Sequence, residues 1–208
     1  RPARAIAPLI IAALSFLGTT GNAYQVNDKL ALIGLISGAG QCQRVAATLA
    51  GEEDPQNTEN QCRGAVPAQF TLHFFADEAN EFYLKLGYAA GNALNSTSPW
   101  QLAPWAADLE NNVKNINGRD RDYLLVAAYT HTLMFSEEHS LGIVGGILDS
   151  TYVLDANRFA NDEYTQFMNE SLVNSGSYSL PSYDAGIGLK WQLGRWGLNL
   201  LGMNIGEN

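Results

Sequence analysis

The chain has little charge, little proline and almost no cysteine. Of its 208 residues, 16% are charged, 7 are proline and 2 are cysteine, whereas 46% are hydrophobic. A chain this apolar can bury a core, which excludes an intrinsically disordered protein. The low proline content also excludes a collagen-like chain.

Basic residues and long apolar runs are scarce as well. Lys and Arg number 12 against 21 acidic residues, which gives a formal net charge of -9. Nucleic acid is therefore not an expected partner, because phosphate binding needs a concentrated basic surface. A membrane-spanning helix takes about 20 consecutive apolar residues. The longest apolar stretch, near the start of the chain, is shorter, which excludes a helical membrane bundle.

The first residues have the features of an export signal. Arg1 and Arg4 precede an apolar run over residues 5–17, and Gly21-Asn22-Ala23 supplies the small-x-small pattern of a cleavage site. We therefore predict that residues 1–23 are a signal peptide and that the mature chain begins at Tyr24. The alternative is a buried N-terminal helix.

The two cysteines, Cys42 and Cys62, flank a polar stretch that we expect to be an exposed loop. In an oxidising compartment they could form a disulfide, and closing a loop of this size would stabilise the fold by about 3 kcal/mol in the chain-entropy model. The alternative is a pair of free thiols. Without clustered histidines, they do not suggest zinc.

Alternating apolar and polar residues indicate strands along most of the chain. The clearest case covers residues 183–193, and similar alternation covers residues 66–74 and 82–88. We predict an all-β protein with seven strands, at residues 28–41, 65–76, 81–91, 122–135, 139–149, 183–193 and 196–206. On one face of the last hairpin's first strand we place Tyr183, Ala185, Ile187, Leu189, Trp191 and Leu193.

The predicted connections alternate between long loops and tight turns. Such a layout, with strands long enough to cross a bilayer, is typical of an outer-membrane β-barrel. Aromatic residues near the tight turns (Phe74, Phe75, Phe82, Phe135, Trp191 and Trp196) and near the loop ends (Tyr88, Tyr123 and Tyr183) would form two interfacial girdles. Seven strands cannot close a bacterial barrel, which normally has an even number, so we expect further strands beyond this piece.

A family resemblance supports this interpretation. The segments GILDST at residues 146–151 and DANRFANDEYTQFMN at residues 155–169 closely resemble the carbohydrate-selective porins of the OprB family. The resemblance implies a sixteen-stranded, transmembrane, antiparallel up-and-down β-barrel in a Gram-negative-type outer membrane, of which residues 24–208 would be the N-terminal part. It also implies passive diffusion of monosaccharides such as glucose, often through a homotrimer.

The loop at residues 150–182 is too long for a simple hairpin connection, and folded inward it would narrow the pore. Its charged and amide side chains suit sugar hydroxyls. The candidate pore-lining residues are Asp149, Asp155, Asn157, Arg158, Asp162, Glu163, Gln166 and Asn169, with Lys85 and Lys190 on the polar strand faces. The alternative is that these residues cap turns and pack the loop.

No catalytic constellation accompanies these residues. His73, His131 and His139 lie on three different predicted strands, and the acids of residues 155–163 lack the glycine and spacing of a calcium loop. We therefore expect no enzyme activity, no metal and no cofactor. Two other functions remain open: an exported soluble carbohydrate-binding β-sandwich, and an outer-membrane barrel that is an enzyme or adhesin.

Overall fold

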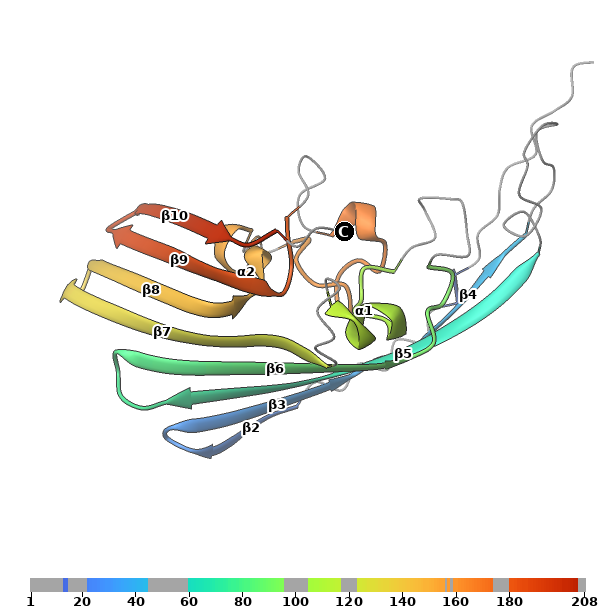
Figure 1. Ribbon diagram of the computed structural model, residues 1–208, viewed down its shortest axis with the longest axis horizontal. Helices are drawn as coiled ribbons and strands as arrows, with labels where there is room; N and C mark the ends of the chain where they lie inside the picture. The colour runs from blue at the N-terminus through green and yellow to red at the C-terminus, as the bar shows by residue number, and fades with distance from the viewer. Residues whose placement is uncertain are drawn as a thin grey trace, which may run out of the picture.

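One antiparallel β-sheet makes up most of the structure, and two short α-helices lie on one side of it (Figure 1). The computed structural model describes residues 13–14, 22–44, 60–95, 105–116, 123–155, 157, 159–173 and 180–205. Within these ranges, ten strands join in a single sheet that is not closed into a barrel. The prediction of an all-β fold is confirmed.

The sheet uses short and long strands. The strands are β1 (Ala13–Leu14), β2 (Asn22–Asn27), β3 (Leu30–Ile36), β4 (Ala39–Gln43), β5 (Gln61–Phe75), β6 (Asn80–Ala90), β7 (Leu124–Ser136), β8 (His139–Leu148), β9 (Asp184–Leu193) and β10 (Trp196–Met203). The helices are α1 (Glu110–Lys114) and α2 (Ser150–Leu154), and η3 (Glu170–Leu172) is a single 3-10 turn. No helix among the described residues is long and apolar enough to cross a membrane.

The strands follow an up-and-down order. From β5 to β10, each strand pairs with the next one along the chain, while β3 and β4 both pair with β5. Tight turns join β2 to β3, β5 to β6, β7 to β8 and β9 to β10, all at the left end of the sheet in Figure 1. The β6–β7 loop (residues 91–123) and the β8–β9 loop (residues 149–183) start from the opposite end. The predicted alternation of connections is confirmed.

The first predicted strand, residues 28–41, is observed as two collinear strands. Ile36 pairs with Ala68 and Ala39 pairs with Ala65, so both strands keep one register against β5. The interruption lies opposite Pro67, which has no backbone N–H to donate to the ladder.

Strand β2 was missed, because residues 22 and 23 fall inside the predicted signal peptide. The strand pairs with β3 through a turn at Asp28 and Lys29, so the predicted count of seven strands is too low. Strand β1 also lies within the predicted leader and pairs with β4. The cleavage site itself stays a prediction.

The two faces of the sheet differ in chemistry. Directly paired residues share a face, so the register places Phe70, Leu86, Ile143, Leu189 and Leu200 on one apolar face. Among the exposed side chains of this face are Phe70 (60%), Ile187 (59%) and Leu198 (52%). Gln69, Thr71, Lys85 and Lys190 lie on the opposite, polar face, as the alternation predicts.

The predicted position of Tyr183 is wrong. The alternation predicts it on the apolar face with Ile187 and Leu189, but its backbone has φ of +58°, which breaks the alternation just before β9. Its side chain lies instead on the polar side, where the hydroxyl donates to Asp108 across 2.8 Å. Tyr183 is therefore no part of an outward-facing aromatic girdle.

The two long loops cover part of the polar face. Trp105, Ala107 and Leu109 of the β6–β7 loop pack with Ala65 of the sheet and Tyr164 of the β8–β9 loop. In α1, Val113 packs with Leu125 and Val126 of β7, and in α2, Val153 packs with Val144 and Leu148 of β8. The core thus lies between the polar face and the loops, and leaves the apolar face uncovered among the described residues.

Candidate functional site

A cavity of about 630 Å³ lies between the polar face of the sheet and the two long loops. It combines side chains from the strands and from both loops, most of them polar. Its polar lining includes Gln69, Glu81, Tyr83, Lys85, Asp108, Asn111, Asn112, Asn115, Thr130, Asp149, Thr151, Tyr152, Asn161, Asp162, Glu163, Tyr164, Ser182 and Tyr183. A volume of this size accommodates a small organic solute such as a monosaccharide.

The strand contribution to this cavity follows from alternation. Glu81, Tyr83 and Lys85 are every second residue of β6, and their partners on β5 and β7 include His73 and Thr130. The His73 ring nitrogen Nδ1 lies 2.7 Å from the Glu81 carboxylate. This wall of the cavity is therefore already ordered by contacts between neighbouring strands.

Asp108, from the β6–β7 loop, connects several walls of the cavity. Its Oδ2 accepts hydrogen bonds from the Tyr183 hydroxyl at 2.8 Å and from Gln69 Nε2 at 3.1 Å. The same Gln69 Nε2 lies 3.1 Å from the Tyr164 hydroxyl. These bonds join a sheet residue, both loops and the start of β9 in one buried network.

Acidic side chains outnumber basic ones in the cavity lining around Lys85. Burial raises the pKa of Asp108 above its ordinary value, while the Lys85 ammonium opposes that shift. Burial, reinforced by the charge of Asp108, raises the pKa of Glu163 to about 8. A neutral carboxyl at pH 7 can donate a hydrogen bond, so Glu163 adds a donor to a cavity otherwise rich in acceptors.

Trp105 joins the two loops. Its indole Nε1 donates to the carbonyl of Glu163 at 3.0 Å, and the backbone of Trp105 pairs with that of Asn169. Asn95 bonds both backbone groups of Trp105 at 2.8 Å. Trp105 is 1% exposed, so its side chain packs the two loops against each other.

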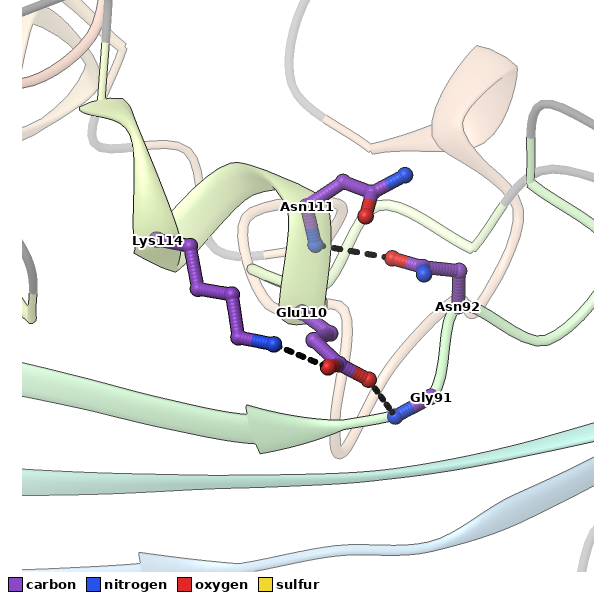
Figure 2. Close-up of polar contacts among 5 residues, drawn as sticks. All are labelled: Gly91, Asn92, Glu110, Asn111 and Lys114. Atoms are coloured by element: carbon purple, nitrogen blue, oxygen red, sulfur yellow. Dashed lines mark hydrogen bonds and ion pairs between the residues drawn. The ribbon is translucent and has the colours of Figure 1, made fainter.

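Helix α1 is fixed to the end of β6 by polar contacts, which Figure 2 shows. The Glu110 carboxylate accepts from the Gly91 N–H at 2.7 Å and from Lys114 one helical turn on. The Asn111 N–H donates to the Asn92 side chain at 2.8 Å. The bonds from Lys114 and Gly91 hold the pKa of Glu110 below its ordinary value. These contacts set the position of Asn111 and Asn112, which line the cavity.

Helix α2 is capped at its N-terminus by Asp149, whose Oδ1 accepts from the Thr151 N–H at 3.0 Å. Two side chains contact the Tyr152 ring: Tyr83 stacks at 6.1 Å between ring centres, and the Lys190 ammonium lies 3.8 Å from the ring centre. Lys190 also donates to the Tyr152 carbonyl at 3.1 Å. The polar-face lysine Lys190 therefore anchors α2, and it does not line the cavity.

The other predicted pore-lining residues divide into two groups. Lys85, Asp149, Asp162 and Glu163 line the cavity. The others organise the loop itself: Asn157 bonds Asp155 at 3.0 Å, Gln166 accepts from the Asn161 N–H at 2.7 Å, and Asn169 accepts from the Ser171 N–H at 2.9 Å. Asp162 does both, since its Oδ1 accepts from Tyr164 and Thr165 N–H groups. Arg158 lies outside the described residues.

Sequence reasoning missed Asp108 and its partners. Gln69 was recognisable as a polar-face residue from the alternation of β5, but nothing near Asp108 in the sequence indicates that its loop folds back over β5. Among the described residues, no group of three or more His, Cys, Asp or Glu side chains is placed to hold a metal ion.

Comparison with known proteins finds a relative that this chain matches over part of its length. A protein of Aquifex aeolicus (strain VF5), described as an uncharacterized protein, is 38% identical over 116 residues. The matched region is 54% of this chain and 36% of the relative, so the chain matches about a third of that protein's length. No family model matches the chain, and no solved structure matches it.

Proposed function

We propose that this chain forms part of an outer-membrane porin, through which carbohydrates such as glucose and other small solutes diffuse passively. One observation carries the proposal: the same sheet exposes an apolar face on one side and bears a polar, loop-covered cavity on the other. A porin wall needs this division, because its outside meets lipid and its inside meets water.

The uncovered apolar face supports a lipid environment. Contiguous exposed apolar patches beyond a few hundred Å² are rare on soluble monomers and mark an interaction surface. Here the exposed side chains run across several neighbouring strands: Val66, Phe70, Phe74, Phe82, Tyr129, Leu133, Ile187, Leu193, Leu198 and Leu200. Exposed Phe135 and Trp196 near the tight turns fit an aromatic girdle at one membrane interface.

Strand length supports the same proposal. A tilted strand crosses the hydrocarbon layer with about 9 to 11 residues. Strands β5, β6, β7, β8 and β9 have 15, 11, 13, 10 and 10 residues. Strands of soluble sandwiches are most often about 5 or 6 residues long.

The edges of the sheet need partners in this proposal. An unpaired backbone group in lipid costs several kcal/mol, so β2 and β10 must pair with further strands for the wall to close. The sixteen strands implied by the OprB resemblance would meet this need. The same resemblance implies a homotrimer, and export by a signal peptide would deliver the chain. With β2 included, the ten described strands exceed the seven strands that the alternation predicts for this chain.

The cavity is suited to neutral polyhydroxylated solutes. Asparagine amides, tyrosine hydroxyls and carboxyl groups line it from several directions, and these groups pair with sugar hydroxyls. Passive diffusion needs only such reversible contacts and no catalytic residue. The alternative, an exported soluble carbohydrate-binding β-sandwich, would need a second sheet packed on the apolar face, and the described residues form one sheet.

Two measurements test the proposal on the full-length protein. First, membranes are washed with urea and then extracted with detergent; a porin stays in the membrane until detergent is added, whereas a sandwich leaves with urea. Second, the purified protein is reconstituted in liposomes, which should swell in isotonic glucose. Release by urea, or liposomes that do not swell, would contradict the proposal.

A further inference from the structure

The hairpin of β4 and β5 extends past the rest of the sheet at the long-loop end, as Figure 1 shows. Its two strands are covalently linked by the Cys42–Cys62 disulfide, at positions that face each other directly in the β4–β5 ladder. The crosslink lies at the loop end of the hairpin, one residue before the long connection from β4 to β5 begins.

Both long loops rest on this hairpin. Ala39 of β4 and Ala65 of β5 are buried in one cluster with Ala93 and Leu109 of the β6–β7 loop and Tyr164 of the β8–β9 loop. The Ala93 N–H also donates to the Gly64 carbonyl of β5 at 3.2 Å. The hairpin is therefore a common support for both loops.

Gln41, the residue beside Cys42, contacts both loops with one side chain. Its Oε1 accepts from the Leu94 N–H of the β6–β7 loop at 3.0 Å, and its Nε2 lies 3.7 Å from the sulfur of Met168 in the β8–β9 loop. Gln41 is 6% exposed, so both contacts are shielded from water. The two loops also contact each other directly, because the Ala106 N–H donates to the Met168 carbonyl at 3.0 Å.

We propose that the disulfide-linked β4–β5 hairpin holds both loops over the cavity, with Gln41 as the positioning residue, so that the redox state of Cys42 and Cys62 sets the width of the passage. The inference rests on the proposed function, since it assigns a regulation to the same passage. Strand β4 has five residues, and one of the residue pairs in its ladder with β5 is Gly40 with Gly64, neither of which has a side chain to pack. Without the crosslink, only backbone pairing and the contacts with the loops hold this end of the ladder, so it opens more easily.

The redox step is ordinary thiol–disulfide exchange. A dithiol such as dithiothreitol attacks one sulfur to give a mixed disulfide, and its second thiol then displaces the protein sulfur. The S–S bond of the protein breaks, a cyclic disulfide forms on the reductant, and Cys42 and Cys62 each gain one electron and one proton.

The test compares the size limit of the channel in oxidised and reduced protein. Full-length protein in liposomes is assayed for swelling in a series of sugars of increasing length, and single channels are recorded for current noise. Reduction, the C42S/C62S double variant and Gln41→Ala should each shift the limit to longer sugars and increase the noise. Dithiothreitol should not change the double variant further, and Gln192→Ala, the same truncation near the tight turns, should match the wild type.

A second measurement does not require a working channel. Amide hydrogen exchange at Leu94 and Ala106 should accelerate when the folded protein is reduced, because their acceptors lie on Gln41 and Met168. If oxidised protein passes no sugar, the proposed function fails. The amide exchange measurement still tests whether the disulfide-linked hairpin holds the two loops. Equal exchange before and after reduction, or an unchanged size limit in a working channel, would overturn the inference.

Discussion

Trp105 and Glu163, 58 residues apart in the sequence, are joined by a hydrogen bond of 3.0 Å from the Trp105 indole to the Glu163 carbonyl. The bond fixes the backbone of the one cavity residue whose carboxyl group has a pKa raised to about 8. The two loops therefore cover the cavity as a single unit. A substitution in either loop should alter the conformation of the other.

Replacing Trp105 with Ala should separate the loops. Truncating a buried aromatic residue costs about 3 to 5 kcal/mol, and here the hydrogen bond to Glu163 is lost as well. We expect faster amide exchange at Ala106 and a larger size limit in liposome swelling. Phe159→Ala is the matched control, because Phe159 lies in the β8–β9 loop and is 81% exposed. Equal behaviour of the two variants would contradict this assignment.

The ion preference of the passage should change near pH 8. Glu163 is neutral below its pKa of about 8 and negative above it, so raising the pH adds one negative charge to the cavity and favours cations. The reversal potential in a salt gradient, measured from pH 6 to pH 10, should show this step. Glu163→Gln cannot ionise and should abolish it; a step that persists in this variant would assign it to another group.

Lys85 should set the position of that step. Its ammonium lowers the pKa of both Glu163 and Asp108, against the effect of burial. In Lys85→Gln, this stabilisation of the carboxylates is absent, so the midpoint of the reversal-potential curve should move to higher pH. Lys29→Gln removes the same charge at an exposed tight turn and should leave the midpoint unchanged. A downward shift in Lys85→Gln would be inconsistent with the observed cluster.

Gly91 should be intolerant of a side chain. Its φ is +80°, and a Cβ at this position would lie 2.4 Å from the Gly64 carbonyl oxygen. Gly91→Ala should therefore cost about 1 to 3 kcal/mol in backbone strain and displace α1, whose Glu110 bonds the Gly91 N–H (Figure 2). Gly40→Ala, nearby in β4 with nothing within 4 Å of the added carbon, is the control. Thermal melts followed by tryptophan fluorescence should separate the two variants.

Alternation in the sequence was enough to assign most strands and their faces. In β9, Ile187 and Leu189 lie on the apolar face and Lys190 on the polar face, as predicted. The predictions fail at residues where the local sequence pattern does not indicate the actual backbone conformation. Tyr183 continues the apolar alternation in sequence, but its positive φ turns it toward Asp108. Strand β2 was lost because its first residues also satisfy the pattern of a cleavage site.

The site was less predictable than the fold. Lys85 was identified because it alternates with apolar neighbours on β6, and Asp149, Asp162 and Glu163 because charged side chains in a long loop suit sugar hydroxyls. Asn157 and Gln166 were assigned to the lining on residue type alone, but their side chains bond the backbone of their own loop. Residue type cannot distinguish these roles, because the same amide suits a turn or a ligand.

By itself, the sequence determined the strands, the two chemically different faces and the alternation of tight turns with long loops, because a strand's period of two residues is a local property. The tertiary structure alone decided that Asp108 meets Tyr183 and Gln69, that Trp105 joins the loops, and that Gln41 binds both. Those contacts connect residues far apart in the chain through loops without a repeating pattern. Only the packing of the loops on the sheet brings them together.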